Sequence, residues 1–339
     1  MSRPRRRALV LAAGFGRRLR PLTAALPKPL LPVAGRPLVA WTLDALVAAG
    51  CEGIALNLHH QGEAIATALG PHHRGVPLHY SREPEILGTL GAVWPLRDFL
   101  AAAAEILIVN GDSLCRWPLR ALAARHRRTG AAATLLVADR ADPAAFGGGI
   151  ALARDGRVLA FRSAALVTGL ARRRRVFAGA QIWRPELLAR VGEGYADTVE
   201  ALYQPLLAAG EPLQTLATRR PWHDLGTPAR YLAGALAWGL AGLPPGGVRR
   251  GPGATIARGA RVESSPAVPV AGRRCPLRIV IDPPADARIL QEEIFGPAVV
   301  IKAYDEVGEA ITDINSRPRP LALYYFGEDA TEQQRVLDH

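Results

Sequence analysis

The sequence predicts an α/β protein built on a Rossmann-like, mostly parallel sheet with helices on both faces. Through about the first 140 of its 339 residues, short apolar runs alternate with segments of helical spacing. Such alternation is typical of strands joined by helical crossovers, which place parallel strands in one sheet and cover both its faces. Two of the apolar runs end in glycine or aspartate, the residue types expected where open α/β sheets bind ligands.

The alternation can be followed along the chain. Residues 8–13 form an apolar run that leads into Gly14-Phe15-Gly16, which is typical of a buried strand followed by a glycine loop. A second strong strand at 106–109 ends in Asn110-Gly111-Asp112. Further strands are expected at 54–58, 78–80 and 132–137, and helices at 37–49, 61–69, 91–99 and 119–128.

From about residue 150 the pattern becomes mixed α+β. Asp155-Gly156, between two short apolar runs, indicates a hairpin. A strand is expected at 176–183 and helices at 195–209 and 231–239. The proline- and glycine-rich stretch from Leu243 is typical of a linker, and residues 248–262 resemble a left-handed hexapeptide β-helix that stops short. We predict three parts, namely a main domain (1–242), a linker with the truncated β-helix (243–265) and a C-terminal part (266–339).

The chain is basic, with a formal net charge of +12, but its composition argues against a nucleic-acid partner. The runs of arginine at 5–7 and 172–175 are interpreted as solvated, and no zinc-finger or helix-turn-helix spacing is present. No stretch reaches transmembrane length, so no membrane partner is expected. The three isolated cysteines are typical of a protein in a reducing cytoplasm.

Lysine is rare in this chain. Lys28 and Lys302 are the two lysines among 42 basic residues, and the others are arginine. A lysine that persists against this bias can be one whose compact ammonium group arginine cannot replace. Lys28 is therefore a candidate functional residue before any motif is considered.

Four motifs carry candidate chemistry. The first is the glycine loop of residues 11–23 with Pro27-Lys28-Pro29 after it; Leu19 stands where a dinucleotide-binding loop has its third glycine. The second is residues 83–92, Glu-Pro-Glu-Ile-Leu-Gly-Thr-Leu-Gly-Ala. The third and fourth are the aspartates of Asn110-Gly111-Asp112 and of Trp222-His223-Asp224.

These motifs resemble the family of nucleotidyltransferases that make nucleoside-diphosphate sugars. The first signature is matched by Gly14, Gly16, Arg18, Leu19, Pro21, Leu22, Thr23, Pro27, Lys28 and Pro29, whereas Arg17 stands where the family usually has threonine. The resemblance implies the nucleotide-diphospho-sugar transferase fold over about residues 7–262. It also implies transfer of a nucleotidyl group from a nucleoside triphosphate to a sugar 1-phosphate, with Mg²⁺ as cofactor and pyrophosphate as the second product.

The same resemblance implies site residues. Arg18 would hold the leaving pyrophosphate and Lys28 would neutralise charge on the α-phosphate. The nucleotide would contact Leu11, Ala12, Ala13, Gly14, Gly16, Arg18, Glu83, Gly88 and Thr89; the sugar phosphate would contact Asn110, Gly147 and Arg162; and magnesium would be held by Asp112 and Asp224.

Base and sugar stay open at this point. A carboxylate at Glu83 would favour a base that offers N–H donors, which indicates GTP over UTP or dTTP. Residues 177–188 and 197–199 resemble bacterial members that act on mannose, heptose or N-acetylmuramate 1-phosphates. The family's lysine for the sugar phosphate is missing; Arg162, or an arginine of 172–175, would replace it. A homo-oligomer is possible.

The tail resembles a different family. From about residue 275 the chain is similar to the C-terminal part of an aldehyde dehydrogenase, in which Glu293 and Phe295 would lie beside NAD. The upstream cysteine nucleophile is missing, and Cys275 lies too close to the motif to replace it, so we expect no dehydrogenase activity. Two alternatives to the transferase are an NAD-dependent aldehyde dehydrogenase fragment and a catalytically silent nucleotide-binding homologue.

Overall fold

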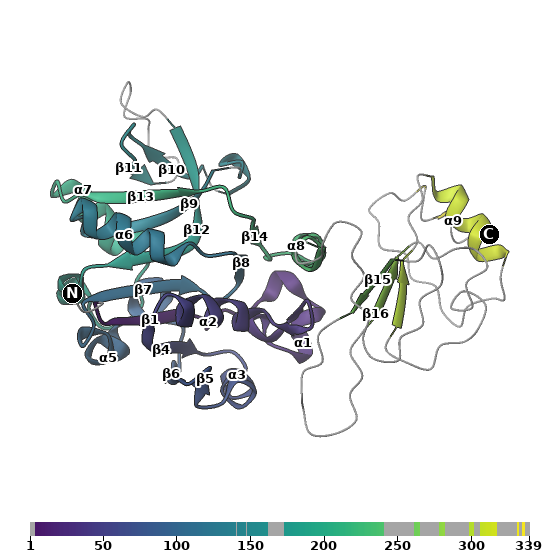
Figure 1. The fold of residues 1–339 in the computed structure, drawn as a ribbon, viewed down its shortest axis with the longest axis horizontal. Helices are drawn as coiled ribbons and strands as arrows, with labels where there is room; N and C mark the ends of the chain where they lie inside the picture. The colour runs from purple at the N-terminus through teal and green to yellow at the C-terminus, as the bar shows by residue number, and fades with distance from the viewer. Residues whose placement is uncertain are drawn as a thin grey trace. The chain divides into compact units, whose positions relative to one another are not determined.

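The computed structural model describes two compact units, which meet in sequence at residues 238 and 239. In the first unit it describes residues 4–139, 141–146, 148–161 and 173–238, and helix α8 (Pro228–Leu240) continues two residues past the division. In the second it describes residues 261–264, 278–281, 298–301, 306–316, 331, 334 and 335. Figure 1 shows the elements of both units.

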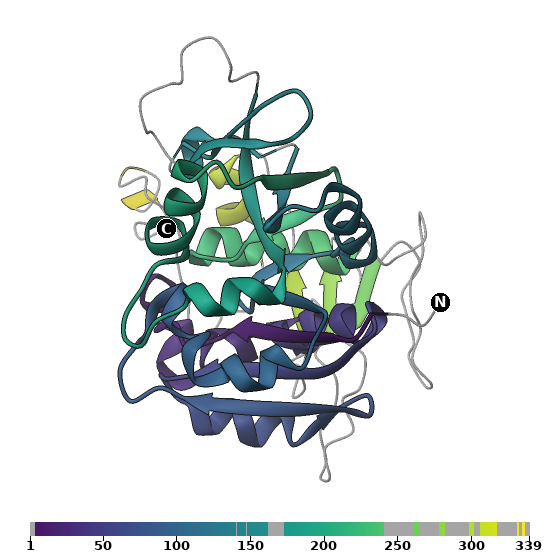
Figure 2. The same cartoon turned by 90° about the vertical axis from the view of Figure 1, so that its left-hand side faces the viewer.

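The first unit contains one large mixed sheet. Its strands are β1 (Arg6–Leu11), β4 (Cys51–Leu58), β5 (His72–His73), β6 (Val76–Arg82), β7 (Glu105–Asn110), β9 (Ala133–Ala138), β10 (Ile150–Leu152), β11 (Val158–Phe161), β12 (Arg173–Trp183) and β13 (Leu213–Thr218). Their order is β11-β10-β12-β7-β1-β4-β6-β5. Strand β9 also pairs with β12, and β13 pairs with β9. Strand β1 is parallel to β4 and β7, and β4 is parallel to β6. Figure 2 shows β1, in purple, within this sheet.

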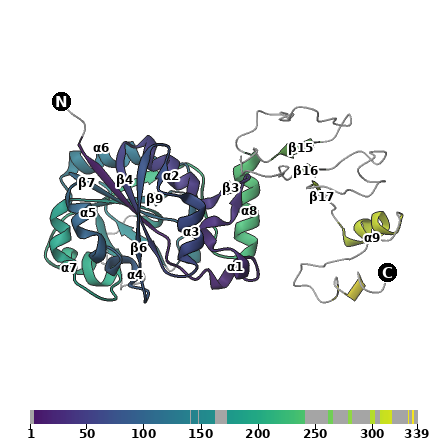
Figure 3. The same ribbon diagram turned by 90° about the horizontal axis from the view of Figure 1, so that it is seen from below.

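The alternating side chains of β1 divide the core into two layers. Ala8 and Val10 pack with α2 (Leu38–Ala48), α3 (Gly62–Leu69) and α6 (Leu119–Thr129). Leu9 faces the other side, where the core includes α4 (Gly88–Gly91), α5 (Arg97–Ala101) and α7 (Gln204–Ala208). Successive strand residues point to opposite faces, so the apolar run at 8–13 serves both layers. Figure 3 shows the sheet between these helices, and the predicted α/β class is confirmed.

One predicted helix begins later than expected. The sequence predicts a helix over 195–209, but residues 195–197 are not helical; a π-helical turn at Val199–Tyr203 leads into α7. The extended residues pack on α4, where the N–H of Leu90 donates to the carbonyl of Ala196 at 2.9 Å. The prediction was wrong there because a tertiary contact takes up the backbone groups that a helix would have paired.

The buried phenol of Tyr203 joins β12 to this turn. Its hydroxyl accepts a hydrogen bond from Trp183 Nε1 at 2.6 Å and donates one to Gln181 Oε1 at 2.5 Å. All three side chains are buried, and burial raises the pKa of Tyr203, so the hydroxyl stays protonated.

Tyr203→Phe is therefore expected to lower the free energy of unfolding by about 1–3 kcal/mol, because it leaves the Trp183 donor and the Gln181 acceptor buried without partners. Urea-induced unfolding of the full chain measures this difference. A loss below about 0.5 kcal/mol, the range of ordinary surface substitutions, would contradict the assignment.

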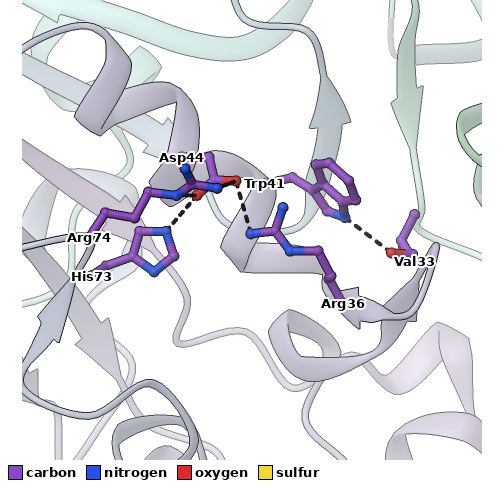
Figure 4. A network of polar contacts seen from close by, with 6 residues as sticks. All are labelled: Val33, Arg36, Trp41, Asp44, His73 and Arg74. Atoms are coloured by element: carbon purple, nitrogen blue, oxygen red, sulfur yellow. Dashed lines mark hydrogen bonds and ion pairs between the residues drawn. The ribbon is translucent and has the colours of Figure 1, made fainter. Parts of the chain in front are cut away.

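A polar network fixes the hairpin that follows Lys28. Strands β2 (Pro32–Val33) and β3 (Arg36–Pro37) form this hairpin, and Asp44 on α2 binds it. One Asp44 oxygen lies 2.9 Å from Arg36 Nη2, and the other lies 2.7 Å from both His73 Nε2 and Arg74 Nε (Figure 4). Asp44 thereby ties two segments, α2 and the His73-Arg74 turn, to the hairpin that follows the lysine.

An indole makes a second tie to the same hairpin. Trp41 Nε1 donates to the carbonyl of Val33 at 3.1 Å, and the Arg36 guanidinium lies 4.5 Å from the centre of the Trp41 ring. On the other side, the hydroxyl of Tyr231 on α8 donates to the carbonyl of Pro32. Helices α2 and α8 therefore hold the hairpin from two directions.

The Asp44 network predicts a pH dependence of stability. Burial raises the pKa of Asp44, but hydrogen bonds from His73, Arg36 and Arg74 outweigh it and hold the pKa below its ordinary value of 3.8. A carboxylate with a depressed pKa contributes stability above its unfolded-state pKa and loses it as the pH falls through the folded-state pKa.

Asp44→Asn is accordingly expected to lower the free energy of unfolding by about 1–2 kcal/mol at pH 7, and the difference from the wild type should shrink as the pH falls below 3.8. Urea titrations of both proteins at several pH values test this. A difference that is the same at every pH would contradict it.

The second unit contains a small sheet and one long helix among its described residues. Strand β15 (Arg261–Ser264) pairs antiparallel with β16 (Arg278–Ile281), which is parallel to β17 (Ala298–Ile301), and α9 spans Val307–Asn315. Of the predicted β-helix at 248–262, residues 248–260 lie outside the described residues, as do Cys275, Glu293 and Phe295. In the described part of the chain, no helix is long and apolar enough to cross a membrane.

Candidate active site

The glycine loop turns sharply after β1. Gly16 has a φ of 62°, and its carbonyl accepts a hydrogen bond from the buried Thr23 hydroxyl at 2.8 Å. A Cβ at Gly16 would come within 3.0 Å of Thr23 and 3.4 Å of the Lys28 Cβ, so the loop and the lysine segment pack closely. A Cβ at Gly14 would meet nothing within 4 Å, which leaves the backbone there open to a ligand.

A cavity of about 440 Å³ lies against this loop. It brings together most of the residues predicted from the motifs: Leu11, Ala12, Ala13, Gly14, Gly16, Arg18, Lys28, Gly88, Thr89, Asn110 and Asp112. It is also lined by residues that were not among the predicted site residues: Phe15, Arg17, Leu19, Pro29, Asn57, Ile86 and Gly226. Backbone N–H groups of a glycine loop together with arginine and lysine side chains suit a polyphosphate.

Lys28 and Asp112 meet at this cavity. The ammonium group of Lys28 lies 2.8 Å from Asp112 Oδ2, and the lysine side chain is 8% exposed whereas that of Asp112 is 44% exposed. Gly111 makes the approach possible, because its N–H donates to the carbonyl of Leu11 and its absent Cβ would lie 3.0 Å from that oxygen. The ends of β1 and β7 therefore share one edge of the cavity.

A short antiparallel pair brings the two predicted magnesium ligands to the same edge. Strands β8 (Ser113–Cys115) and β14 (Trp222–Asp224) place Asp224 opposite Ser113, the residue after Asp112. A Cβ at Gly226 would lie 3.0 Å from both Asp224 Oδ1 and Arg18 Nη2. Asp224, 112 residues after Asp112 in sequence, therefore lies close to Arg18, the arginine predicted to hold pyrophosphate.

A second cavity, of about 400 Å³, is lined by all three residues of β14, including Asp224. Arg230 on α8 reaches into it: its Nη1 lies 2.8 Å from Asp224 Oδ2, and its guanidinium lies 4.8 Å from the centre of the Phe146 ring. Arg219 and Arg220 also line the cavity, so its charge favours an anion.

Of the predicted sugar-phosphate contacts, Asn110 lines the first cavity, whereas Gly147 and Arg162 lie outside the described residues.

Glu83 does not line either of these cavities. Its carboxylate accepts hydrogen bonds from Asn57 Nδ2 at 2.8 Å and from the N–H of Leu87 at 3.1 Å, and the residue is 4% exposed. Base reading by Glu83 stays a prediction, and Asn57 is the polar side chain that reaches the first cavity from this side. The rule that polar residues at strand ends mark the ligand edge would have indicated Asn57, which lies near the end of β4.

The loop around α4 is fixed by a segment that the motifs missed. Gly88 has a φ of 77°, and a Cβ there would lie 2.5 Å from the carbonyl oxygen of Ala196. A Cβ at Gly91 would clash with the carbonyl oxygen of Gly194. Thr89, predicted to bind nucleotide, accepts hydrogen bonds at 2.9 Å from both the N–H and the hydroxyl of Thr198. The glycines are therefore required by packing as well as by any ligand.

Neither cysteine in the first unit suits nucleophilic chemistry. Cys51 and Cys115 are buried, and burial raises the pKa of each thiol to about 12, so both stay protonated at neutral pH. His223, next to Asp224, is half-buried, and burial lowers its pKa. The charged residues predicted to act are Arg18, Lys28 and Asp112, which line the first cavity, and Asp224, which lines the second.

Two protein families match separate parts of the chain. A family described as nucleotidyl transferase matches residues 7–238, and the aldehyde dehydrogenase family matches residues 251–339, which confirms the resemblance of the tail. The second match begins within the stretch for which the truncated β-helix was predicted.

Curated relatives match about two thirds of this chain. The catalytic subunit beta of mannose-1-phosphate guanylyltransferase from Drosophila pseudoobscura pseudoobscura is 32% identical over 233 residues, 67% of this chain and 61% of that protein. The mannose-1-phosphate guanyltransferase of Schizosaccharomyces pombe is 31% identical over 231 residues, 67% of this chain and 63% of that protein. The chain therefore spans less than two thirds of the length of these relatives.

Solved structures share the fold. HddC from Yersinia pseudotuberculosis complexed with GMP-PN superposes with a TM-score of 0.57 at 18% identity, covering 68% of this chain and 99% of that one. A putative glucose-1-phosphate thymidylyltransferase from Bacillus anthracis superposes with a TM-score of 0.59 at 18% identity, covering 68% and 94%. At this identity the likeness establishes the fold of the first unit.

Proposed function

The chain belongs to the nucleotidyl transferase family, and on that premise we propose that it transfers a nucleotidyl group from a nucleoside triphosphate to a sugar 1-phosphate. The observation that carries this proposal is the first cavity, in which the glycine loop, Arg18 and the Lys28–Asp112 pair converge. Its occupant would be the triphosphate, with the base toward Asn57 and Gly88.

The reaction needs no nucleophilic side chain. An oxygen of the sugar phosphate attacks the α-phosphorus in line, the bond from that phosphorus to the bridging oxygen breaks, and pyrophosphate leaves with the bonding electrons. Lys28 places its charge on the α-phosphate, where negative charge builds in the transition state, and Arg18 holds the leaving group. Catalysis then consists of positioning and electrostatic stabilisation.

The aspartates fit a divalent cation. Asp112, directly before β8, and Asp224, on the paired strand β14, supply hard carboxylate oxygens, and no third histidine, cysteine, aspartate or glutamate joins them in the described residues. Magnesium takes one or two carboxylates and completes its shell with phosphate oxygens and waters, so we propose Mg²⁺ with these two ligands. The bound cation would neutralise charge on the reacting phosphates.

We propose GTP as the nucleotide and mannose 1-phosphate or a heptose 1-phosphate as the acceptor, with UTP or dTTP as alternatives. The relatives named as mannose-1-phosphate guanylyltransferases support guanine. Glu83 does not add to this support, because both of its oxygens accept hydrogen bonds within the protein. The second cavity, with its aromatic rings and arginines, would take the sugar phosphate, and Arg230 would replace the family's lysine together with or instead of Arg162.

We also propose a cytoplasmic location, no nucleic-acid or membrane partner and a possible homo-oligomer. The free, buried thiols of Cys51 and Cys115 are consistent with a reducing compartment.

Pyrophosphate release tests the proposed function. The full chain is incubated with Mg²⁺, each of four nucleoside triphosphates and a panel of sugar 1-phosphates. Release that requires both substrates is expected, fastest with GTP. A folded protein whose melting temperature rises with GTP but which releases no pyrophosphate would instead be the catalytically silent homologue.

A further inference from the structure

The two loops of the first cavity are joined by one buried hydrogen-bonded chain. Asn57 Oδ1 accepts from the N–H of Ala12 in the glycine loop at 2.8 Å, and Asn57 Nδ2 donates to Glu83 Oε1 at 2.8 Å. Glu83 Oε2 accepts from the N–H of Leu87, directly before Gly88, at 3.1 Å. These hydrogen bonds therefore connect the glycine loop to the turn at Leu87 and Gly88.

Both members of this chain are buried, and their orientation is determined. Asn57 is 3% exposed and Glu83 is 4% exposed. The N–H of Ala12 can only donate, so the Asn57 amide presents its oxygen to Ala12 and its NH₂ group to Glu83, both of whose oxygens accept. A buried group without a partner is costly, so neither loop can shift away from Asn57 without losing a buried hydrogen bond.

A histidine of the same strand end supports the connection. His59 Nδ1 lies 2.8 Å from the carbonyl oxygen of Glu83, and its ring packs edge-on against Phe15 of the glycine loop, with 5.3 Å between centroids. The end of β4 therefore contacts both loops through two side chains.

We propose that Asn57 and Glu83 form a positioning relay that sets the affinity of the site for the nucleoside triphosphate. This inference rests on the proposed function and adds to it. Glu83 acts through Asn57, which lines the cavity, rather than by touching the base itself. The relay holds the Ala12 N–H and the Leu87–Gly88 turn at a fixed separation, so base and phosphates are bound in one register.

The hydrogen-bond polarity of the relay allows the amide and the carboxylate to be exchanged between positions 57 and 83. In Glu83→Gln, an NH₂ group must face another donor. The introduced NH₂ group faces the N–H of Leu87 if Asn57 keeps its orientation; if Asn57 flips to accept from the glutamine, the Asn57 NH₂ group faces the N–H of Ala12 instead. In Asn57→Asp, two carboxylates face each other. In the double variant, the introduced aspartate accepts from Ala12 and from the introduced glutamine, whose oxygen accepts from Leu87, so every hydrogen bond and the net charge are restored.

The test compares these three variants with the wild type in steady-state kinetics, using the triphosphate that gives the highest turnover. Each single variant is expected to raise KM for the triphosphate about tenfold or more, while KM for the sugar phosphate and kcat change less than about threefold. The double variant should return KM to within about threefold of the wild type. Tyr203→Phe is the control, because it should lower the melting temperature without changing KM.

Single variants with an unchanged KM for the triphosphate, or a double variant no better than the singles, would overturn the relay. If the wild type releases no pyrophosphate, the proposed function fails separately, and the relay is judged by calorimetric titration of the same variants with GTP. Weakened binding in the singles with recovery in the double would then support it, and absent or equal binding in all four proteins would overturn it.

Discussion

Lys28→Ala is expected to lower kcat by about a hundredfold to a thousandfold while the protein stays folded. The lysine ammonium is 2.8 Å from Asp112 in the first cavity, and its side chain is almost fully buried, so water cannot replace the charge easily. It is one of two lysines in a chain that otherwise uses arginine. Steady-state pyrophosphate release measures the loss, and circular dichroism verifies the fold.

Two further variants make the result specific to this lysine. Lys28→Arg keeps the charge but places a wider, planar group in a closely packed position, so it should recover little of the activity. Arg128→Ala removes an exposed positive charge on α6 and should behave as the wild type. A kcat for Lys28→Ala within about threefold of the wild type would show that the lysine does not act on the reacting phosphate.

Asp112→Asn is expected to lower kcat by at least about a hundredfold and to weaken the dependence of the rate on Mg²⁺. The substitution keeps the size of the side chain but removes the charge that faces both Lys28 and the proposed cation. Calorimetric titration with Mg²⁺ in the presence of GTP gives a readout that does not depend on turnover, and the variant should bind the cation more weakly.

The matched control for this charge change is Asp98→Asn. Asp98 lies on α5 with its side chain 96% exposed, so its loss should leave both the rate and the magnesium titration unchanged. An Asp112→Asn protein with the wild-type magnesium dependence would exclude Asp112 as a ligand. Asp224, on the paired strand, would then have to hold the cation without it.

The fold of the first unit could be predicted because its central strands contain short apolar runs that end in recognisable turns. Strand β7 and the Asn110-Gly111-Asp112 turn lie where the sequence places them. The structured loop at 194–198 could not be predicted in the same way. Its residues have helical spacing, and its extended path depends on contacts with Gly88 and Gly91, far away in the sequence.

In the candidate site, too, the residues of local motifs could be predicted, whereas those that depend on tertiary contacts could not. Glycines, Lys28 and the two aspartates belong to local motifs, and the structure places them around one strand edge. The parts that depend on tertiary pairing were missed: Asn57 as the link between the loops, and Arg230 as the partner of Asp224. A hydrogen bond between residues 57 and 83 leaves no spacing pattern in a single sequence.

In the proposed reaction the chain transfers the nucleotidyl group of a nucleoside triphosphate, and with it the α-phosphate, to a sugar 1-phosphate. The most direct measurement uses GTP labelled at the α-phosphorus, mannose 1-phosphate, Mg²⁺ and the full chain, followed by separation of the products. We predict that the label appears in a nucleoside-diphosphate sugar and that unlabelled pyrophosphate forms in equal amount. The proposed reaction would be contradicted if the label stayed in the nucleoside triphosphate, whichever base and sugar were tried. It would also be contradicted if the label appeared only in free nucleotides.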